Sequence, residues 1–176
     1  MRTLTRIAAL IALAAGSIWA TTLEQMSVSQ MIEQSTAIVR AKVQGSYAAT
    51  WNGSIYTFYR VQVLENLKSQ TQATVDVAVP GGSLSGIRSN VAGAPELKAG
   101  AEYVLFLWTS KSGLTQIIGL SQGAFDVKPG TTGEVVLLRA AVSEQMVDSQ
   151  GRVVRDQGMS LSLSDLRERV RREGAK

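Results

Sequence analysis

The segment Gly119-Leu120-Ser121-Gln122-Gly123 has the spacing of a catalytic motif, G-x-S-x-G. In hydrolases with this motif, a strand-to-helix turn exposes the serine beside a histidine base. The sequence contains no histidine and no cysteine. Serine hydrolysis, a thiol nucleophile, disulfides and a zinc site with the usual ligands are therefore excluded. We interpret the two glycines as flanking a turn between strands, and we predict no catalytic residue, no metal ligand and no cofactor.

Carboxylates are the remaining side chains that could support hydrolysis. A glycosidase-type reaction needs two of them facing each other across a cleft. The 14 Asp and Glu residues are scattered along the chain, mostly at expected turns and strand ends. We therefore predict a protein that is not an enzyme, and a carboxylate-based hydrolase stays as an alternative.

Aromatic residues gather in one short segment of the chain. After the first twenty residues, five of the nine aromatic residues are Tyr47, Trp51, Tyr56, Phe58 and Tyr59. The segment belongs to a predicted β-hairpin, because Asn-Gly at positions 52 and 53 favours a two-residue turn. The way in which this hairpin pairs decides which rings face solvent.

Two registers of the hairpin compete. A two-residue turn pairs residues whose numbers sum to 105, which would place Val43 opposite a glutamine. A sum of 106 pairs Val43 with Val63 and keeps the valines on one face. Because a slip of one residue reverses every side chain, we expect a three-residue loop or a β-bulge, for which Gly45 is a natural site.

The register that sums to 106 divides the aromatic residues between the two faces of the sheet. The residues that it turns toward the core are Tyr47, Trp51 and Tyr59. It leaves Tyr56, Phe58 and Arg60 facing outward. Tyr and Arg are enriched at the centres of interfaces, so we predict that Tyr56, Phe58 and Arg60 form a binding surface. The alternative is that the rings are cross-strand pairs that only stabilise the sheet.

Residues 1–20 have the features of a cleavable signal peptide. Arg2 and Arg6 precede an uncharged apolar run at residues 7–15, and small residues follow. Cleavage after Ala20 fits best, and cleavage after Ser17 is the alternative. We therefore expect a secreted or periplasmic protein, and the lack of cysteines favours a bacterial one. No later segment is long and apolar enough to span a membrane.

The mature chain, residues 21–176, reads as a single mainly β domain with short helices at both ends. We expect strands at residues 38–44, 55–68, 74–79, 103–108, 114–118, 124–128 and 134–139, a hairpin at 143–155, and helices at 23–35 and 162–173. The strand at 103–108 is apolar on both faces, which predicts a central strand covered on both sides. The fold class that follows is an OB-like barrel of five or more strands, closed or partly open. Its core spans about residues 36–140, and a C-terminal hairpin and helix follow at about 142–174.

Four stretches of the chain resemble the netrin-like domain of the tissue inhibitors of metalloproteinases. They are residues 36–43, 59–68, 97–105 and 119–127. The resemblance implies an OB-type barrel, and it adds a protease inhibitor to the possible functions. Those inhibitors chelate the protease metal through an N-terminal cysteine, which this chain lacks.

The charge of the chain gives no reason to expect a nucleic-acid partner. The net charge of the full sequence is +4, with 18 basic and 14 acidic residues, and it falls to +2 when Arg2 and Arg6 leave with the signal peptide. The basic residues near the C-terminus are expected on the solvated face of a helix, where they favour its C-terminal end. We predict an exported binding module that engages a protein or a polysaccharide, with the protease inhibitor and the hydrolase as alternatives.

Overall fold

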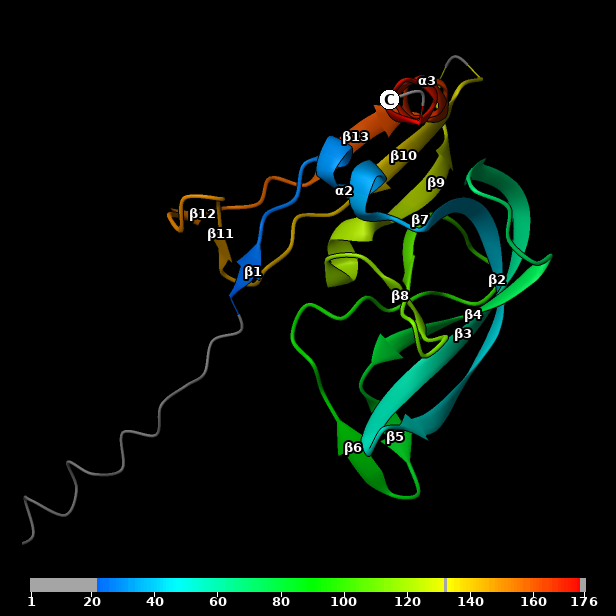
Figure 1. The fold of residues 1–176 in the computed structure, drawn as a ribbon, viewed down its shortest axis with the longest axis vertical. Helices are drawn as coiled ribbons and strands as arrows, with labels where there is room; N and C mark the ends of the chain where they lie inside the picture. The colour runs from blue at the N-terminus through cyan, green and yellow to red at the C-terminus, as the bar shows by residue number, and fades with distance from the viewer. Residues whose placement is uncertain (1–21, 132, 175–176) are drawn as a thin grey trace, which may run out of the picture.

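The computed structural model describes residues 22–131 and 133–174, which form a mainly β fold with two short α-helices (Figure 1). The predicted signal peptide lies outside the described residues. Among the described residues, no helix is both long enough and apolar enough to cross a bilayer.

Part of the main sheet curls into a ring. Strand β2 pairs with β3, β3 with β4, β4 with β8, β8 with β7, and β7 back with β2. The pairing of β4 with β8 is parallel and consists of the single bridge between Ala78 and Gln116, so the ring is only partly closed there. The predicted barrel of five or more strands is confirmed. Its strands are β2 (Ala37–Trp51), β3 (Ser54–Lys68), β4 (Thr74–Pro80), β7 (Glu102–Thr109) and β8 (Thr115–Ile117).

The sheet continues beyond the barrel from β7. The added strands are β9 (Ala124–Pro129), β10 (Val135–Arg139) and β13 (Met159–Ser162), of which β13 was not predicted. Helices α2 (Val28–Gln34) and α3 (Leu163–Glu173) lie next to this extension at the upper end of the molecule (Figure 1). Ser162 caps α3 by accepting a hydrogen bond from the Asp165 N–H, as its spacing predicts.

Helix α2 is shorter than predicted because its N-terminal cap comes later. Ser27 and Gln30 form a capping box, so the helix begins at Val28. The residues before it form β1 (Leu23–Glu24), which pairs with β11 (Met146–Val147). The Lys68 ammonium group donates hydrogen bonds to the carbonyl oxygens of Ile32 and Ser35 at the end of the helix.

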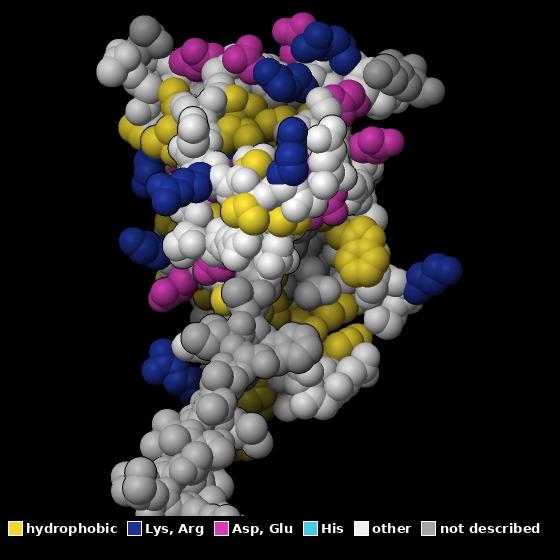
Figure 2. Space-filling view, turned by 90° about the vertical axis from the view of Figure 1, so that its left-hand side faces the viewer, with side chains coloured by type: hydrophobic (Ala, Val, Ile, Leu, Met, Phe, Trp, Pro, Cys, Tyr) yellow, Lys and Arg dark blue, Asp and Glu magenta, His cyan; other side chains and the backbone are white. Residues whose placement is uncertain are grey.

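The remaining short strands form two small hairpins. Strands β11 and β12 (Val153–Val154) form the hairpin that was predicted at residues 143–155. The Gly-rich segment after β4 contains a small hairpin of β5 (Gly82–Leu84) and β6 (Ile87–Ser89). On the side that carries β1, β11 and β12, basic and acidic side chains are mixed, with hydrophobic side chains exposed between them (Figure 2).

The first hairpin changes its pairing register at β-bulges. Near the turn, the paired residue numbers sum to 105 from Trp51–Ser54 to Gly45–Arg60. Gln44 is then skipped, and Val43 pairs with Val61 at a sum of 104. The prediction of a changed register near Gly45 is confirmed, whereas the specific pairs of the 106 register were wrong. The extra residue turns the valine row inward although the two-residue turn is kept.

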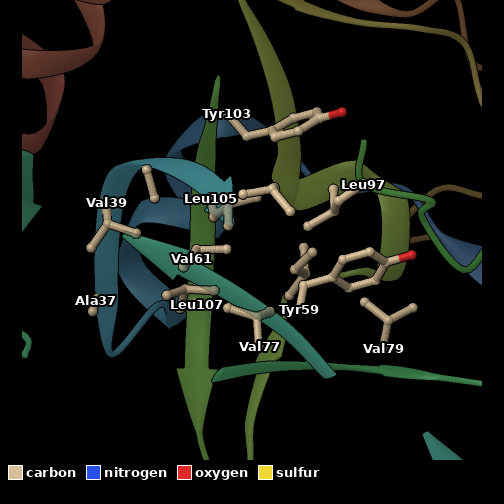
Figure 3. Close-up of a cluster of buried hydrophobic side chains, with 13 residues drawn as sticks. Ala37, Val39, Tyr59, Val61, Val77, Val79, Leu97, Tyr103, Leu105 and Leu107 are labelled. Carbon is tan, nitrogen blue, oxygen red and sulfur yellow. The ribbon is translucent and has the colours of Figure 1, made fainter. Parts of the chain in front are cut away.

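Two apolar clusters lie on opposite faces of the central strand β7. One fills the barrel, where Leu105, Leu107, Val61 and Tyr59 pack together with Leu97 from the loop before β7 (Figure 3). The other lies between the sheet and the helices and includes Phe106 and Phe125 of the sheet, Met31 of α2 and Leu166 of α3. The prediction that both faces of this strand are covered is therefore confirmed for residues 103–107, whereas Trp108 is 45% exposed.

Candidate interaction surface

The outward face of β3 carries the three predicted binding residues in one row. Tyr56, Phe58 and Arg60 alternate along the strand with Tyr59, which is buried in the barrel at 7% exposure. The rings of Tyr56 and Phe58 are half-buried rather than fully exposed. The structure thus brings the predicted residues together on one side of the sheet.

Tyr47 joins this row, contrary to the prediction that it points into the core. It lies directly opposite Phe58 on β2 and is 45% exposed. The physical reason is the register of 105 that the two-residue turn imposes up to Gly45. The same register places Trp51, which was also expected to point inward, in the outward row with Tyr47.

The aromatic side chains form a layered stack with Arg60. The rings of Tyr47 and Phe58 are stacked, with centroids 5.3 Å apart and an interplanar angle of 12°. Tyr56 leans on Phe58 at a centroid distance of 6.3 Å. The Arg60 Cζ atom lies over the Tyr47 ring, 5.9 Å from its centroid. Phe58 and Arg60, two residues apart on one face of β3, both lie against the Tyr47 ring.

Asp76 on β4 fixes the polar end of this stack. Its carboxylate accepts hydrogen bonds from the Arg60 Nε at 3.0 Å, the Arg60 Nη2 at 3.1 Å and the Tyr47 hydroxyl at 3.0 Å. These bonds, first those from Arg60, hold the pKa of the Asp76 carboxyl below its ordinary value. Burial and then the bond to Asp76 raise the pKa of Tyr47. We call Tyr47, Tyr56, Phe58, Arg60 and Asp76 the aromatic–arginine surface.

An open cleft of about 800 Å³ adjoins this surface. Arg60 and Asp76 form part of its lining, and the polar side chains that join them are Gln44, Thr71, Gln72, Thr74, Thr109 and Thr115. Asp76 is the one carboxylate among the described residues of this lining. Because its lowered pKa keeps it ionised near neutral pH, Asp76 is poorly suited to act as a general acid.

Sequence reasoning missed two members of the surface, Tyr47 and Asp76. The rejected register of 105 contained the signal for Tyr47, since it pairs Tyr47 with Phe58. For Asp76, the signal is its alternation with Val75 and Val77, which turns its carboxylate away from the core. Its position opposite Arg60 depends on the register of β3 with β4, which no local pattern predicts.

The G-x-S-x-G segment forms a turn between strands, as predicted. Residues Leu120–Gly123 are the 3-10 helix η2 between β8 and β9. Its Gln122 is 2% exposed and serves a structural purpose that the sequence did not reveal. The Gln122 Oε1 accepts a hydrogen bond from the Met26 N–H, and its Nε2 donates to the Glu24 carbonyl, both at 2.9 Å.

The charged residues of α3 lie on its exposed face, as expected. The Arg167 guanidinium donates two hydrogen bonds to the Glu65 carboxylate, which holds the pKa of Glu65 below its ordinary value. Arg172 faces Glu168 one turn before it. Within residues 22–131 and 133–174, no group of three or more Asp or Glu side chains is arranged to hold a metal ion.

Comparison with known proteins adds no relative to this description. No protein-family model matches the chain, and no curated protein or solved structure matches it significantly. The candidate function therefore depends on the geometry of the surface.

Proposed function

We propose that this protein is an exported, non-enzymatic binding module that contacts a protein partner through the aromatic–arginine surface. The observation that carries the proposal is the layered packing of Tyr56, Phe58, Tyr47 and Arg60 on an exposed face of the barrel. Tyr and Arg side chains dominate the energetic centres of protein interfaces. Side chains that are already ordered lose little conformational entropy when a partner binds.

A protein fits this surface better than a polysaccharide. A sugar ring would need a free aromatic face to stack against, but the Tyr47 ring is stacked on Phe58 and has the Arg60 guanidinium over it. The stack combines aromatic rings with an arginine, which suit the mixed apolar and polar side chains of a protein. The adjoining cleft of about 800 Å³ offers room for a protruding side chain or loop of the partner.

Export is the second part of the proposal and comes from the sequence. The basic residues, the apolar run and the small residues of positions 1–20 occur in the order that signal peptidases recognise. We propose a mature protein in the periplasm or outside a bacterial cell. Mass spectrometry of the native protein tests this directly: a first residue of Thr21 or Ile18 supports export, and an intact Met1 in cytoplasmic material refutes it.

The barrel itself does not decide the function. A partly open five-stranded barrel is the architecture that the netrin-like resemblance implies, and such barrels carry many unrelated activities. Protease inhibition stays an alternative, as does a carboxylate-based hydrolase. The partner is therefore sought by capture from the native envelope or medium without assuming a protease.

The capture experiment compares three baits. The first is the purified protein, the second carries Tyr56→Ser with Arg60→Gln, and the third carries Leu138→Ser as a matched control. Leu138 is 39% exposed on β10, away from the aromatic–arginine surface. We expect one protein to be enriched by the first and third baits and to be lost with the second. Equal capture by all three would refute the proposed surface.

A further inference from the structure

A second hollow lies outside the aromatic–arginine surface, beside Trp108. Trp108 comes two residues after Phe106 on the outer face of β7, but Phe106 is buried and Trp108 is 45% exposed. It lies directly opposite Gln116 of β8. A groove of about 600 Å³ opens there, and its lining consists of Met26, Gln34, Trp108, Gln116, Ile117, Ile118, Gly119 and Leu120. We call it the Trp108 groove.

The groove continues toward the N-terminal segment. A smaller hollow of about 200 Å³ shares Met26, Gln34, Gly119 and Leu120 with it, and its other lining residues are Leu23, Glu24, Gln30 and Gln122. The elements that form the two hollows, α2, η2, β7 and β8, lie close together in the middle of the fold (Figure 1). The hollows therefore form one elongated groove.

The walls of the groove are held in place before any ligand arrives. Buried Gln122 fixes the backbone at Met26 and Glu24 through two hydrogen bonds. Gly119 and Leu120 both have positive φ angles, of 60° and 57°. A Cβ atom at Gly119 would come within 3.0 Å of the Met26 sulfur, so only glycine leaves this wall undisturbed. A left-handed leucine is a strained conformation of the kind that gathers at ligand sites.

The chemistry of the lining points to a ligand that is both apolar and hydroxyl-rich. Trp108 offers a wide apolar surface, and the amides of Gln34 and Gln116 can each donate and accept hydrogen bonds. None of the described residues that line the larger hollow carries a charge. An anionic ligand would meet no counter-charge in the groove, and a cationic ligand would meet only the Glu24 carboxylate of the smaller hollow. A purely apolar ligand would leave the amides without partners.

We propose that the Trp108 groove binds a short neutral oligosaccharide. A pyranose ring has an apolar C–H face that can lie on the indole. Its hydroxyl groups can both donate hydrogen bonds to the glutamine amides and accept hydrogen bonds from them. The volume falls in the range of about 300–1,000 Å³ that is typical of small-ligand sites. This site is separate from the aromatic–arginine surface, since the two share no residue.

Titration with defined sugars tests the proposal. The purified protein is titrated calorimetrically with cellohexaose, maltohexaose and chitohexaose, each up to about 10 mM, because a dissociation constant near 1 mM is a weak but specific affinity. We expect at least one of them to bind. Trp108→Ala should lower that affinity at least tenfold, and Gln34→Ala about three- to tenfold, as the loss of one hydrogen bond implies.

Two controls separate the site from the rest of the molecule. Trp51→Phe alters the other tryptophan of the described chain and should leave sugar affinity unchanged. An unchanged melting temperature of Trp108→Ala shows that its loss of affinity is local. Failure of all three sugars to bind, or equal binding by Trp108→Ala, would overturn the proposal. Neither result affects the proposed protein partner, whose capture depends on Tyr56 and Arg60.

Discussion

The ring of Tyr47 stacks on the ring of Phe58 across the β2–β3 ladder, with centroids 5.3 Å apart. A double-mutant cycle with Tyr47→Leu and Phe58→Leu should give a coupling of about 0.5–1.5 kcal/mol in the free energy of unfolding. Urea denaturation of the four proteins measures it. A cycle of Tyr47→Leu with the distant Leu138→Ser should give a coupling near zero. Absence of coupling between Tyr47 and Phe58 would mean that the stack does not form in solution.

The bulge at Gln44 is the feature that allows an outward Tyr47 and an inward valine row in one strand. Deleting Gln44 forces one register from the turn to Ala41, which turns either the valines outward or the aromatic rings inward. We expect a loss of about 3 kcal/mol or more in the free energy of unfolding, or failure to fold.

The matched control for this deletion is Gly45→Ala. A Cβ atom at Gly45 would meet nothing within 4 Å, and Gly45 is not among the glycines with positive φ. We therefore expect a change within about 0.5 kcal/mol, as at an ordinary surface position. Equal stability of the deletion and this control would contradict the bulged register.

Arg139 and Asp156 form a buried ion pair that ties the segment after β12 to β10. Their side chains are 5% and 2% exposed, and the Asp156 Oδ1 accepts a hydrogen bond from the Arg139 Nη2 at 2.8 Å. Asp156→Asn should cost about 3–5 kcal/mol in the free energy of unfolding at pH 7, because it leaves a buried charge without its partner. Glu168→Gln, which breaks the exposed pair with Arg172, should change stability little.

The same pair predicts a dependence on pH. Hydrogen bonds from Arg139 hold the pKa of Asp156 below its ordinary value. Its contribution to stability is thus fully present above the unfolded pKa of about 3.9 and is lost as the pH falls through the lower folded value. The stability difference between the protein and Asp156→Asn should be constant from about pH 5 to 8 and shrink below about pH 4. A difference that grows on acidification would contradict the ion pair.

Gln122 is the buried link between η2 and the segment before α2. Gln122→Leu leaves the Met26 N–H and the Glu24 carbonyl without their side-chain partner and should cost about 1–3 kcal/mol for each group left buried. Hydrogen exchange at the Met26 amide should speed up more than exchange in β7. Ser121→Ala is the control. It should change neither hydrogen exchange nor stability, because we interpret the serine of the G-x-S-x-G segment as a turn residue without a catalytic role. Slow exchange at Met26 in Gln122→Leu would contradict this link.

Period-two alternation was sufficient to predict β2, β3 and β4, and the continuous apolar run at residues 103–108 predicted β7 as a central strand. The short strands β1 and β13 were missed because two to four residues carry too little periodicity to distinguish a strand from a loop. Their pairing partners, at Met146 and on β10, are far away in sequence.

Part of the candidate surface was predictable for the same reason. Tyr56, Phe58 and Arg60 share a row in either register, because they are spaced by two on one strand. Tyr47 was placed on the wrong face because the position of a bulge shifts every later residue of the strand. Asp76 could not be predicted, since its contact with Arg60 depends on a pairing between strands that the alternation leaves open.

Photo-crosslinking from position 56 is the most direct test of the claim that the aromatic–arginine surface contacts a protein. Tyr56 is replaced by p-benzoyl-phenylalanine, which keeps an aromatic ring at the end of the stack, and Leu138 is replaced in the same way as a control. Irradiation in the native envelope or medium should join a single protein to position 56 and not to position 138. No crosslink at position 56, or equal crosslinking at both positions, would contradict the claim.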